Sequence, residues 1–303
     1  MLFLLITILL NTFIFIVFRQ FVQYKVNTFQ AIVINYIICA AIGIYFLEDV
    51  NQLVMVSLKQ IWVQTGLILG VLFIFTFYLM AYTTQACGIS TTTVANKISL
   101  IIPVFFSVYV FFDLKNMLSS TEYIGIFIAL LAVFFTSIKN SKQKTKIKLP
   151  VFFAILLPFL VFIFGGAIDT LINYSKFHIS TQGEEKVFTT LIFLVAALIG
   201  TVVLLFKIFF LNEIFEGKSL LAGIVLGTPN FFSIYYLVKT LSHFNNNGAF
   251  VYPVCNMGII ILSGIIAVLI FKEKLSTINK IGMGMAIISL LLISYKEILN
   301  FKF

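Results

Sequence analysis

The chain has 303 residues, of which 61% are hydrophobic and only 10% are charged. A soluble domain carries roughly 25% charged residues, so water is not the solvent for most of this surface. The net charge of +9 does not indicate nucleic-acid binding, because the basic residues form no stripe with interleaved aromatic side chains. They lie mostly between long apolar runs, as basic residues do in the cytoplasmic loops of membrane proteins.

The apolar runs predict helices that cross a membrane. Runs such as Met1 to Phe18 and Ile155 to Phe164 do not alternate apolar and polar residues, which excludes the strands of a membrane barrel. In hydrocarbon, a run of about 20 residues must satisfy its own backbone amides, and an α-helix does so. The first run has no basic n-region and no small-residue cleavage site, so we expect a span rather than a signal peptide. We expect ten helices, at residues 2–18, 29–47, 61–83, 89–112, 121–138, 150–173, 187–211, 219–240, 247–271 and 277–295.

An internal repeat relates the two halves of the chain. Sliding the sequence on itself by 157 positions gives a match that needs no gap, and it brings glycines of several helix pairs into register. The identities include Gly43 and Gly200, Gly66 and Gly223, Gly70 and Gly227, Phe75 and Phe232, Tyr78 and Tyr235, and Gly125 and Gly282.

The repeat predicts two units of five helices, at residues 1–138 and 150–303, joined by a basic linker at residues 139–149 that holds five lysines. Because five is odd, the second unit must enter the membrane from the opposite side, so the repeats are predicted to be inverted. Inverted repeats recur in secondary transporters, which place the substrate near the midplane between the halves. A duplication retained for packing alone is the alternative.

One motif carries a family resemblance that extends over nearly the whole chain. The segment Phe271-Lys-Glu273-Lys-Leu-Ser276, followed by Gly282, resembles the "gE-x-l-s" signature of the drug/metabolite transporter superfamily, in its ten-helix EamA-like branch. The first half departs from the signature, because Asn116 stands where the acid is expected. The resemblance implies ten helices around a central cavity, and export or exchange of small metabolites by alternating access without ATP. It does not select a substrate among amino acids and other small organic solutes.

Lys97 is the first candidate substrate-binding residue. It falls in the fourth predicted span, about 5 Å from the centre of that helix at 1.5 Å per residue. An ionisable group at such depth marks a pathway, a substrate contact or a charge pair. Asn96 and the helix-breaking Pro103 suggest an inward-facing polar strip beside it. The alternative is a lysine that snorkels to the interface along its own stem.

Asp169 is the candidate for proton coupling. It follows Gly165 and Gly166 in the sixth predicted span, and intramembrane aspartates are elements of proton relays. A carboxylate at a helix end near the interface is the alternative. The predicted span centres leave an axial gap of roughly 16 Å between Asp169 and Lys97, so the two are expected at different ends of one cavity.

Two prolines in the second half predict further helix breaks with polar neighbours. Pro229 precedes Asn230, and Tyr252-Pro253 is followed by Asn256. A proline removes one helical hydrogen bond and frees a carbonyl. Such groups are tolerated in a membrane where a cavity or polar neighbours satisfy them, so the two asparagines and Tyr252 are candidate substrate contacts. A kink without a ligand is the alternative.

Other conspicuous residues are assigned to structure. Glycine pairs four residues apart allow close helix packing, within or between the halves, with dimerisation as a further possibility; they are Gly66 with Gly70 and Gly223 with Gly227. Glu273 and Gly282 are assigned to the family motif, with a structural ion pair expected at Glu273. The three cysteines have no C-x-x-C spacing and the two histidines are too few for a metal site, so no metal and no cofactor is expected.

The sequence leaves alternatives open for the orientation of the chain in the membrane and for its function. Loops after odd-numbered helices hold ten Lys or Arg and the other loops with the C-terminus hold six, which places both termini outside by the positive-inside rule. The resemblance implies both in the cytoplasm. We expect a multi-pass protein of the cell membrane, the inner membrane in a Gram-negative cell, as a monomer or homodimer. A channel, a receptor or a membrane-embedded enzyme is the alternative to a carrier, although an enzyme would need a convergent set of catalytic groups.

Overall fold

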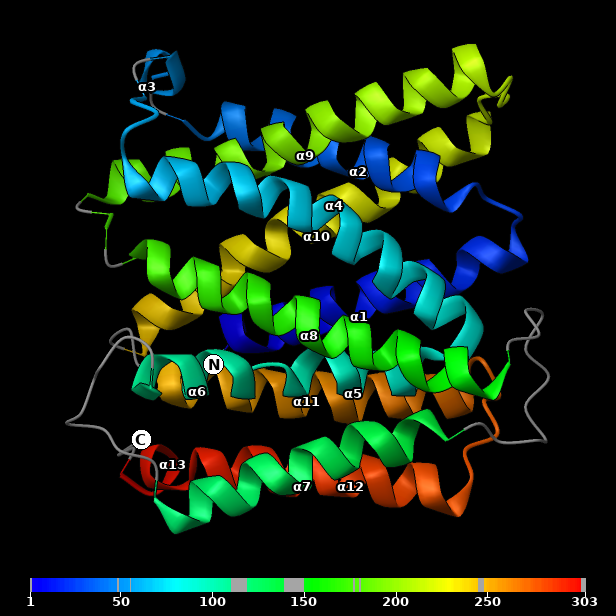
Figure 1. The fold of residues 1–303 in the computed structure, drawn as a ribbon, viewed down its shortest axis with the longest axis vertical. Helices are drawn as coiled ribbons and strands as arrows, with labels where there is room; N and C mark the ends of the chain where they lie inside the picture. Colours follow the sequence, from blue (N-terminus) through cyan, green and yellow to red (C-terminus); the bar gives the residue numbers. More distant parts are fainter. Residues whose placement is uncertain are drawn as a thin grey trace.

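The structure is a computed structural model that describes residues 2–47, 49–54, 56–109, 119–138, 150–176, 178–179, 181–244 and 248–300. Within these ranges all regular structure is helical. The long helices lie side by side and run between two ends of the molecule (Figure 1). In chain order the helices are α1 (Leu2–Gln23), α2 (Thr28–Tyr45), α3 (Asn51–Val54), α4 (Ile61–Cys87), α5 (Ile89–Ile98), α6 (Ile101–Tyr109), α7 (Ser120–Ser137), α8 (Val151–Lys176), α9 (Gln182–Phe210), α10 (Gly217–His243), α11 (Gly248–Leu269), α12 (Thr277–Ile293) and α13 (Tyr295–Asn300).

These helices confirm an all-helical membrane protein at the level of helix length and composition. In the described part of the chain, nine helical segments are long and apolar enough to cross a bilayer. The α5 and α6 helices together form one of them, from Ile89 to Phe106. Helix α12 is apolar but has only 17 residues, about 26 Å at 1.5 Å per residue. The linker at residues 139–149 and the motif position Asn116 lie outside the described residues.

The fourth predicted helix is divided in the structure. Helix α5 ends at Ile98 and α6 begins at Ile101. Pro103 explains the division, because it has no amide with which to bond the Ser99 carbonyl four residues earlier. That carbonyl instead accepts the Ile102 amide at 2.9 Å, which tightens the chain into a turn. The predicted break at Pro103 is therefore found a few residues upstream of the proline itself.

The breaks predicted at Pro229 and Pro253 are not found. Helix α10 continues through Pro229 and α11 continues through Pro253. Helix α8 likewise continues through Pro158. A proline inside a helix removes one hydrogen bond, and each of these three helices continues despite that loss.

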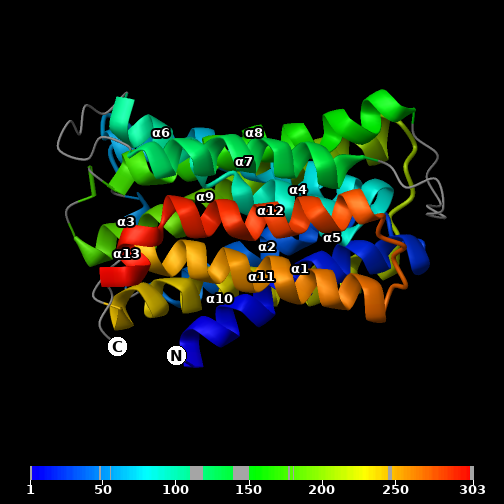
Figure 2. The same cartoon turned by 90° about the horizontal axis from the view of Figure 1, so that it is seen from below.

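Most extensive helix contacts join the first half of the chain to the second. Helix α7 packs along α12, α2 packs against α9 and α10, and α4 packs against α8 and α9. Helix α1 packs against α10 and α11, while α5 packs against α8 and α11. Both views show the α7 and α12 pair side by side (Figures 1 and 2). The halves are therefore interleaved rather than separate.

The glycine pairs lie at these contacts between the halves. A Cβ on Gly66 would meet Leu191 of α9, and a Cβ on Gly70 would lie 2.5 Å from Val195 of the same helix. In the second half, a Cβ on Gly223 would meet Ile34 of α2. Each glycine thus admits a helix of the other half at close range, which is the packing role expected of small residues in membrane helices.

The same contacts recur 157 positions along the chain. Gly66 faces Leu191, and Gly223 faces Ile34. Gly223 corresponds to Gly66 and Ile34 to Leu191 at the offset of 157, so the second contact is the counterpart of the first. The further pairs follow the same rule: Gly70 with Val195 and Gly227 with Ile38, Gly43 with Thr190 and Gly200 with Val33, and Gly125 with Ile293 and Gly282 with Thr136. The offset found in the sequence therefore holds for residue contacts as well as for residue identities.

Candidate functional site

Lys97 lies in the last turn of α5 and turns its ammonium group toward α1. Its Nζ donates to the Asn11 Oδ1 at 3.2 Å, and the Asn11 amide donates in turn to the Thr7 carbonyl at 3.0 Å. Both Lys97 and Asn11 are half-buried within spans. The lysine therefore makes a specific hydrogen bond to a neighbouring span, which simple snorkelling does not require.

Helix α11 holds the backbone of α5 at the same point. The Asn256 amide donates to the Lys97 carbonyl at 3.0 Å. This carbonyl is in the last turn of α5, where the following turn provides no regular helical partner. Tyr252 lies one turn earlier on α11 and is half-buried. The structure thus brings Asn256, Tyr252 and Lys97 onto two helices that pack together.

Asp169 approaches this group from α8. A Cβ added at Gly165 would lie 3.0 Å from the Ser99 Oγ and 3.2 Å from the Asn96 amide nitrogen, so α8 passes close to the end of α5. Asp169 follows Gly165 by four residues, about 6 Å along the helix. Asp169 therefore lies about one helical turn from the place where α8 meets the end of α5.

The predicted axial gap of roughly 16 Å is therefore wrong. It assumed a continuous fourth helix to residue 112, whose centre lies beyond Lys97. In the structure α5 ends at Ile98, and Gly166 allows Ile102 to pack directly on α8. This places the end of α5 beside the middle of α8, so Asp169 lies only about 6 Å along α8 from the level of Asn96 and Ser99.

The central polar group, defined as Asn11, Lys97, Asp169, Tyr252 and Asn256, combines one cation, one anion and three hydrogen-bonding side chains. Four helices supply it: α1 and α5 from the first half, α8 and α11 from the second. Each of the five residues keeps a partly accessible surface although all lie in spans. Such a set can bind a polar solute through charge and directional hydrogen bonds.

Asn11 was missed by the sequence analysis. It stands in the otherwise apolar run of α1, and a polar amide in mid-span is itself a signal of an inward-facing position. The other predicted residue beside the group is Asn96, whose amide contacts the Met80 sulfur at 3.7 Å. Asn96 is half-buried and faces α8 at Gly165.

Asn230 lies elsewhere, in a buried contact between α10 and α2. Its amide donates to the Asn35 Oδ1 at 3.1 Å and contacts the Cys39 sulfur at 3.6 Å. Cys39 in turn donates to the Gly227 carbonyl at 3.4 Å. With only 4% of its surface exposed, Asn230 is placed to hold two helices of different halves together. Its predicted substrate contact has no support from this position.

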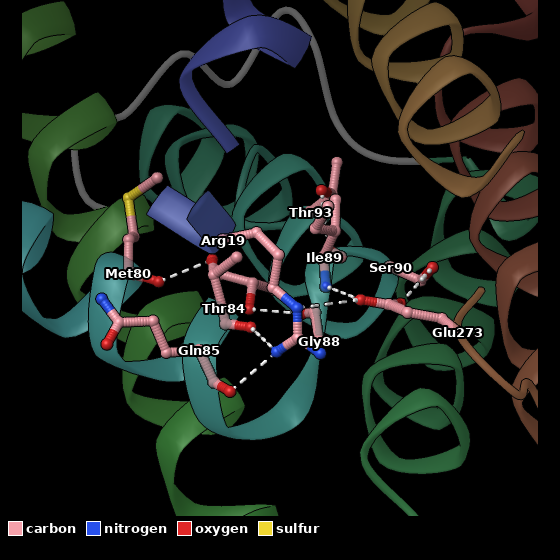
Figure 3. Close-up of polar contacts among 10 residues, drawn as sticks. Arg19, Met80, Thr84, Gln85, Gly88, Ile89, Ser90, Thr93 and Glu273 are labelled. Carbon is pink, nitrogen blue, oxygen red and sulfur yellow. Dashed lines mark hydrogen bonds and ion pairs between the residues drawn. The ribbon is translucent and has the colours of Figure 1, made fainter. Parts of the chain in front are cut away.

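Glu273 forms a second polar cluster, at the junction between α4 and α5 (Figure 3). Its carboxylate accepts from the Ile89 amide at 2.8 Å and from the Ser90 hydroxyl at 3.3 Å. Arg19 reaches it from α1, with Nε at 4.0 Å from the carboxylate. The expected structural ion pair is therefore present, with Arg19 as the partner, and Glu273 is buried rather than at the surface.

The cluster satisfies both helix ends at this junction. Arg19 donates to the Thr84 and Gln85 carbonyls at 3.2 and 2.8 Å, which are exposed where α4 ends. Glu273 caps the amino end of α5, where a negative charge is favoured. Gly88 has φ +105, and a Cβ there would lie 3.0 Å from the Glu273 oxygens. Burial raises the pKa of Glu273, although the Ile89 amide and Arg19 oppose it.

A third polar cluster joins the α9–α10 connection to the start of α2, at the same end of the molecule. Glu213 accepts from the Asn27 amide at 2.7 Å and from the Gln30 amide at 3.1 Å. It also pairs with Lys207 at 3.3 Å. The Gln30 Oε1 accepts the Glu216 backbone amide at 2.9 Å. These contacts again bind one half of the chain to the other.

Comparison with known proteins finds a relative by sequence and a solved structure of similar fold. No family model matches the chain. An uncharacterized protein of Haemophilus influenzae is 26% identical over 277 residues, covering 88% of this chain and 89% of that protein. A solved crystal structure is similar in fold, with a TM-score of 0.59 and 14% identity, over 97% of this chain and 99% of that one. The described residues contain no group of three or more His, Cys, Asp or Glu placed to hold a metal ion.

Proposed function

We propose that the chain is a secondary transporter of the drug/metabolite transporter superfamily, EamA-like branch, that exports or exchanges small organic solutes. It works in the cell membrane by alternating access around the central polar group, and it is not an enzyme. The solutes carry a carboxylate or another anionic group, as amino acids do, because Lys97 presents a cation to them. Lipid surrounds the protein, which acts as a monomer or homodimer.

Contacts that recur between the two halves support this proposal, in which the halves are inverted five-helix repeats. Each contact of a first-half glycine with a second-half helix has a counterpart, in which the matching second-half glycine contacts the matching first-half helix. The set of contacts therefore stays the same when the two halves are exchanged. The helix pairs behave alike: α1 with α10 corresponds to α8 with α4, and α2 with α10 corresponds to α9 with α4. With α12 as the tenth span, each unit has five helices, and inverted units carry substrate sites at their interface in many transporters.

The observation that carries the proposal is the central polar group itself. Charged side chains inside a membrane segment are expensive and mark pathways and substrate sites. Here a lysine and an aspartate from different halves lie within spans that pack together, and both are partly accessible. A solute held between them contacts both halves, so movement of one half against the other changes which side of the membrane it can reach.

The test begins with metabolite export from cells that overproduce the chain, to identify a solute, and continues with counterflow of that solute in proteoliposomes. We expect saturable counterflow. Lys97→Ala should raise KM by about tenfold or more, because hydrogen bonds to charged groups contribute about 1.5–3 kcal/mol. The control is Lys280→Ala, which removes an exposed lysine from the first turn of α12. Flux that does not saturate would indicate a channel, and an unchanged KM would remove Lys97 from the site.

Asp169 is assigned to proton coupling in the same assay. Asp169→Asn keeps the shape of the side chain and removes its proton exchange. We expect the variant to retain counterflow but to lose uphill transport driven by a pH gradient. Uphill transport at the wild-type rate would exclude Asp169 as the coupling group.

A further inference from the structure

An apolar groove lies between α1 and α10, outside the central polar group. Its lining includes Ile6, Leu10 and Phe13 on α1 and Pro229, Phe232 and Tyr236 on α10, and its volume is about 500 Å³. The adjoining face of α1 is exposed at Leu5 and Leu9. Figure 2 shows α10 and the N-terminal part of α1 at the lower edge of the molecule. The groove therefore faces the hydrocarbon that surrounds the spans.

One end of this groove carries aromatic rings, a lysine and a histidine. The Phe3 ring stacks on Tyr236 with centroids 6.1 Å apart and meets the His243 ring edge-on at 6.4 Å. The Lys239 Nζ lies 4.7 Å from the centroid of the Tyr235 ring and 5.7 Å from that of Phe3. Lys239 and His243 are both exposed. The groove thus leads from apolar walls to a basic, aromatic end.

We propose that this groove binds an anionic phospholipid, with one acyl chain along the groove and the phosphate at Lys239 and His243. The dimensions fit a single leaflet. Ten residues separate Pro229 from Lys239, about 15 Å of helix, which is half of a hydrocarbon core about 30 Å thick. An acyl chain that begins at Lys239 therefore ends near Pro229, in mid-membrane.

The charge at the groove end selects an anionic headgroup. Within the described part of the chain, no carboxylate lies at ion-pair distance from Lys239, whose neighbours are the Tyr235 and Phe3 rings. Rings and lysines at the headgroup level are the usual membrane anchors. A phosphate can accept from the ammonium and the imidazole together, whereas a choline group adds a positive charge beside Lys239.

Native mass spectrometry of the full chain in detergent, with phosphatidylglycerol and phosphatidylcholine of identical acyl chains, tests this. We expect the wild-type chain to retain bound phosphatidylglycerol in preference to phosphatidylcholine. Lys239→Ala should weaken its binding about fivefold, the size expected for one lysine near an anionic lipid surface. The matched control is Lys218→Ala, an exposed lysine at the opposite end of the same helix, which should leave binding unchanged.

A second variant separates the acyl chain from the headgroup. Leu10→Trp fills the groove without altering its charge, and it should reduce binding of both lipids, while inorganic phosphate should not displace phosphatidylglycerol. Equal retention of the two lipids, equal losses in Lys239→Ala and Lys218→Ala, or displacement by phosphate alone would overturn the proposal. So would a dimer that binds no lipid, since a second chain would then cover the groove.

Discussion

At the scale of single residues, the glycines set how closely the halves approach. Gly227 faces backbone at close range, since the nearest atom to a Cβ there would be the Asn35 carbonyl oxygen at 2.8 Å, with the Ile38 Cβ also at 2.8 Å. A backbone carbonyl cannot turn aside as a flexible side chain can. The separation of α10 from α2 therefore depends on the absence of one methyl group.

This predicts that Gly227→Ala destabilises the protein. Overpacking a close contact costs about 1–3 kcal/mol, so we expect the variant to unfold at a lower Tm in detergent than the wild-type chain. The control is Gly284→Ala, where a Cβ would meet nothing within 4 Å. There the better helix propensity of alanine, up to about 1 kcal/mol, should keep Tm equal or raise it. A Gly227→Ala Tm at the wild-type value would show that α10 can move away without cost.

The sequence predicted the role of the glycines but not their partners. Spacing of four residues indicates close packing, yet the same pattern suits contacts within a half, between halves or between two chains. Asn230 shows the opposite error, because a polar residue beside Pro229 resembles a substrate contact until Asn35 is seen opposite it. Residue type and spacing identify what a side chain can do, while the facing helix decides what it does.

At the scale of elements, most helices could be predicted because hydrocarbon requires long apolar runs. The helix breaks at prolines were harder to predict. Pro103 ends α5 because the chain can tighten at Ser99, whereas α10 and α11 absorb Pro229 and Pro253. The missing amide is the same in all three, so neighbouring contacts decide between a break and a continuous helix. The end of α5 near Pro103 determines how far Lys97 lies from Asp169 along the helix axes.

The Glu213 cluster predicts a pH-dependent contact between the α9–α10 connection and α2. Burial acts to raise the pKa of Glu213, but hydrogen bonds from Gln30 and Asn27 and the Lys207 ammonium outweigh it and hold the pKa below its usual range. A carboxylate with a lowered pKa stabilises the fold above its unfolded pKa of about 4.3. This stabilisation is lost as the pH falls through the lower folded pKa.

Glu213→Gln should therefore lower Tm at pH 7, and its difference from the wild type should shrink as the pH falls toward 3. Thermal unfolding in one detergent across this pH range measures the difference. Glu216→Gln is the control, an exposed carboxylate three residues along the same connection. A Tm difference that stays constant with pH would show that the charge of Glu213 makes no contribution.

At the scale of the whole molecule, two clusters of polar contacts between the halves lie at one end, while contacts such as Thr65 with Ser175 and Lys296 with Glu122 join the halves elsewhere. The Glu273 and Glu213 clusters both lie where α1 meets α2, α4 meets α5, α9 meets α10 and α11 meets α12 (Figure 1). Arg19, Asn27 and Gln30 come from the first half, and the two carboxylates from the second. Under the proposed transport function, these contacts are expected to separate when this end of the molecule opens.

The same arrangement predicts the side of the membrane that each connection faces. With ten spans, Gly217 at the start of α10 and Lys274 between α11 and α12 lie on one side, whereas Gly183 at the start of α9 and Leu299 in α13 lie on the other. A Cβ at Gly217 would meet nothing within 4 Å, and Leu299 is 77% exposed. Cysteines placed at these four positions should divide into two pairs when labelled in intact cells with a membrane-impermeant maleimide.

The informative pair is Lys274→Cys with Leu299→Cys, because only α12 separates them and its 17 residues leave its crossing open on length alone. Labelling from opposite sides would establish α12 as a span and make the number of crossings even. The unsubstituted chain, with Cys39 and Cys255 buried, gives the background. Labelling from the same side would leave nine spans and remove the inverted pairing of α7 with α12. The side on which Gly217→Cys reacts also decides between the positive-inside count and the orientation implied by the family resemblance, since it identifies the end that faces the cytoplasm.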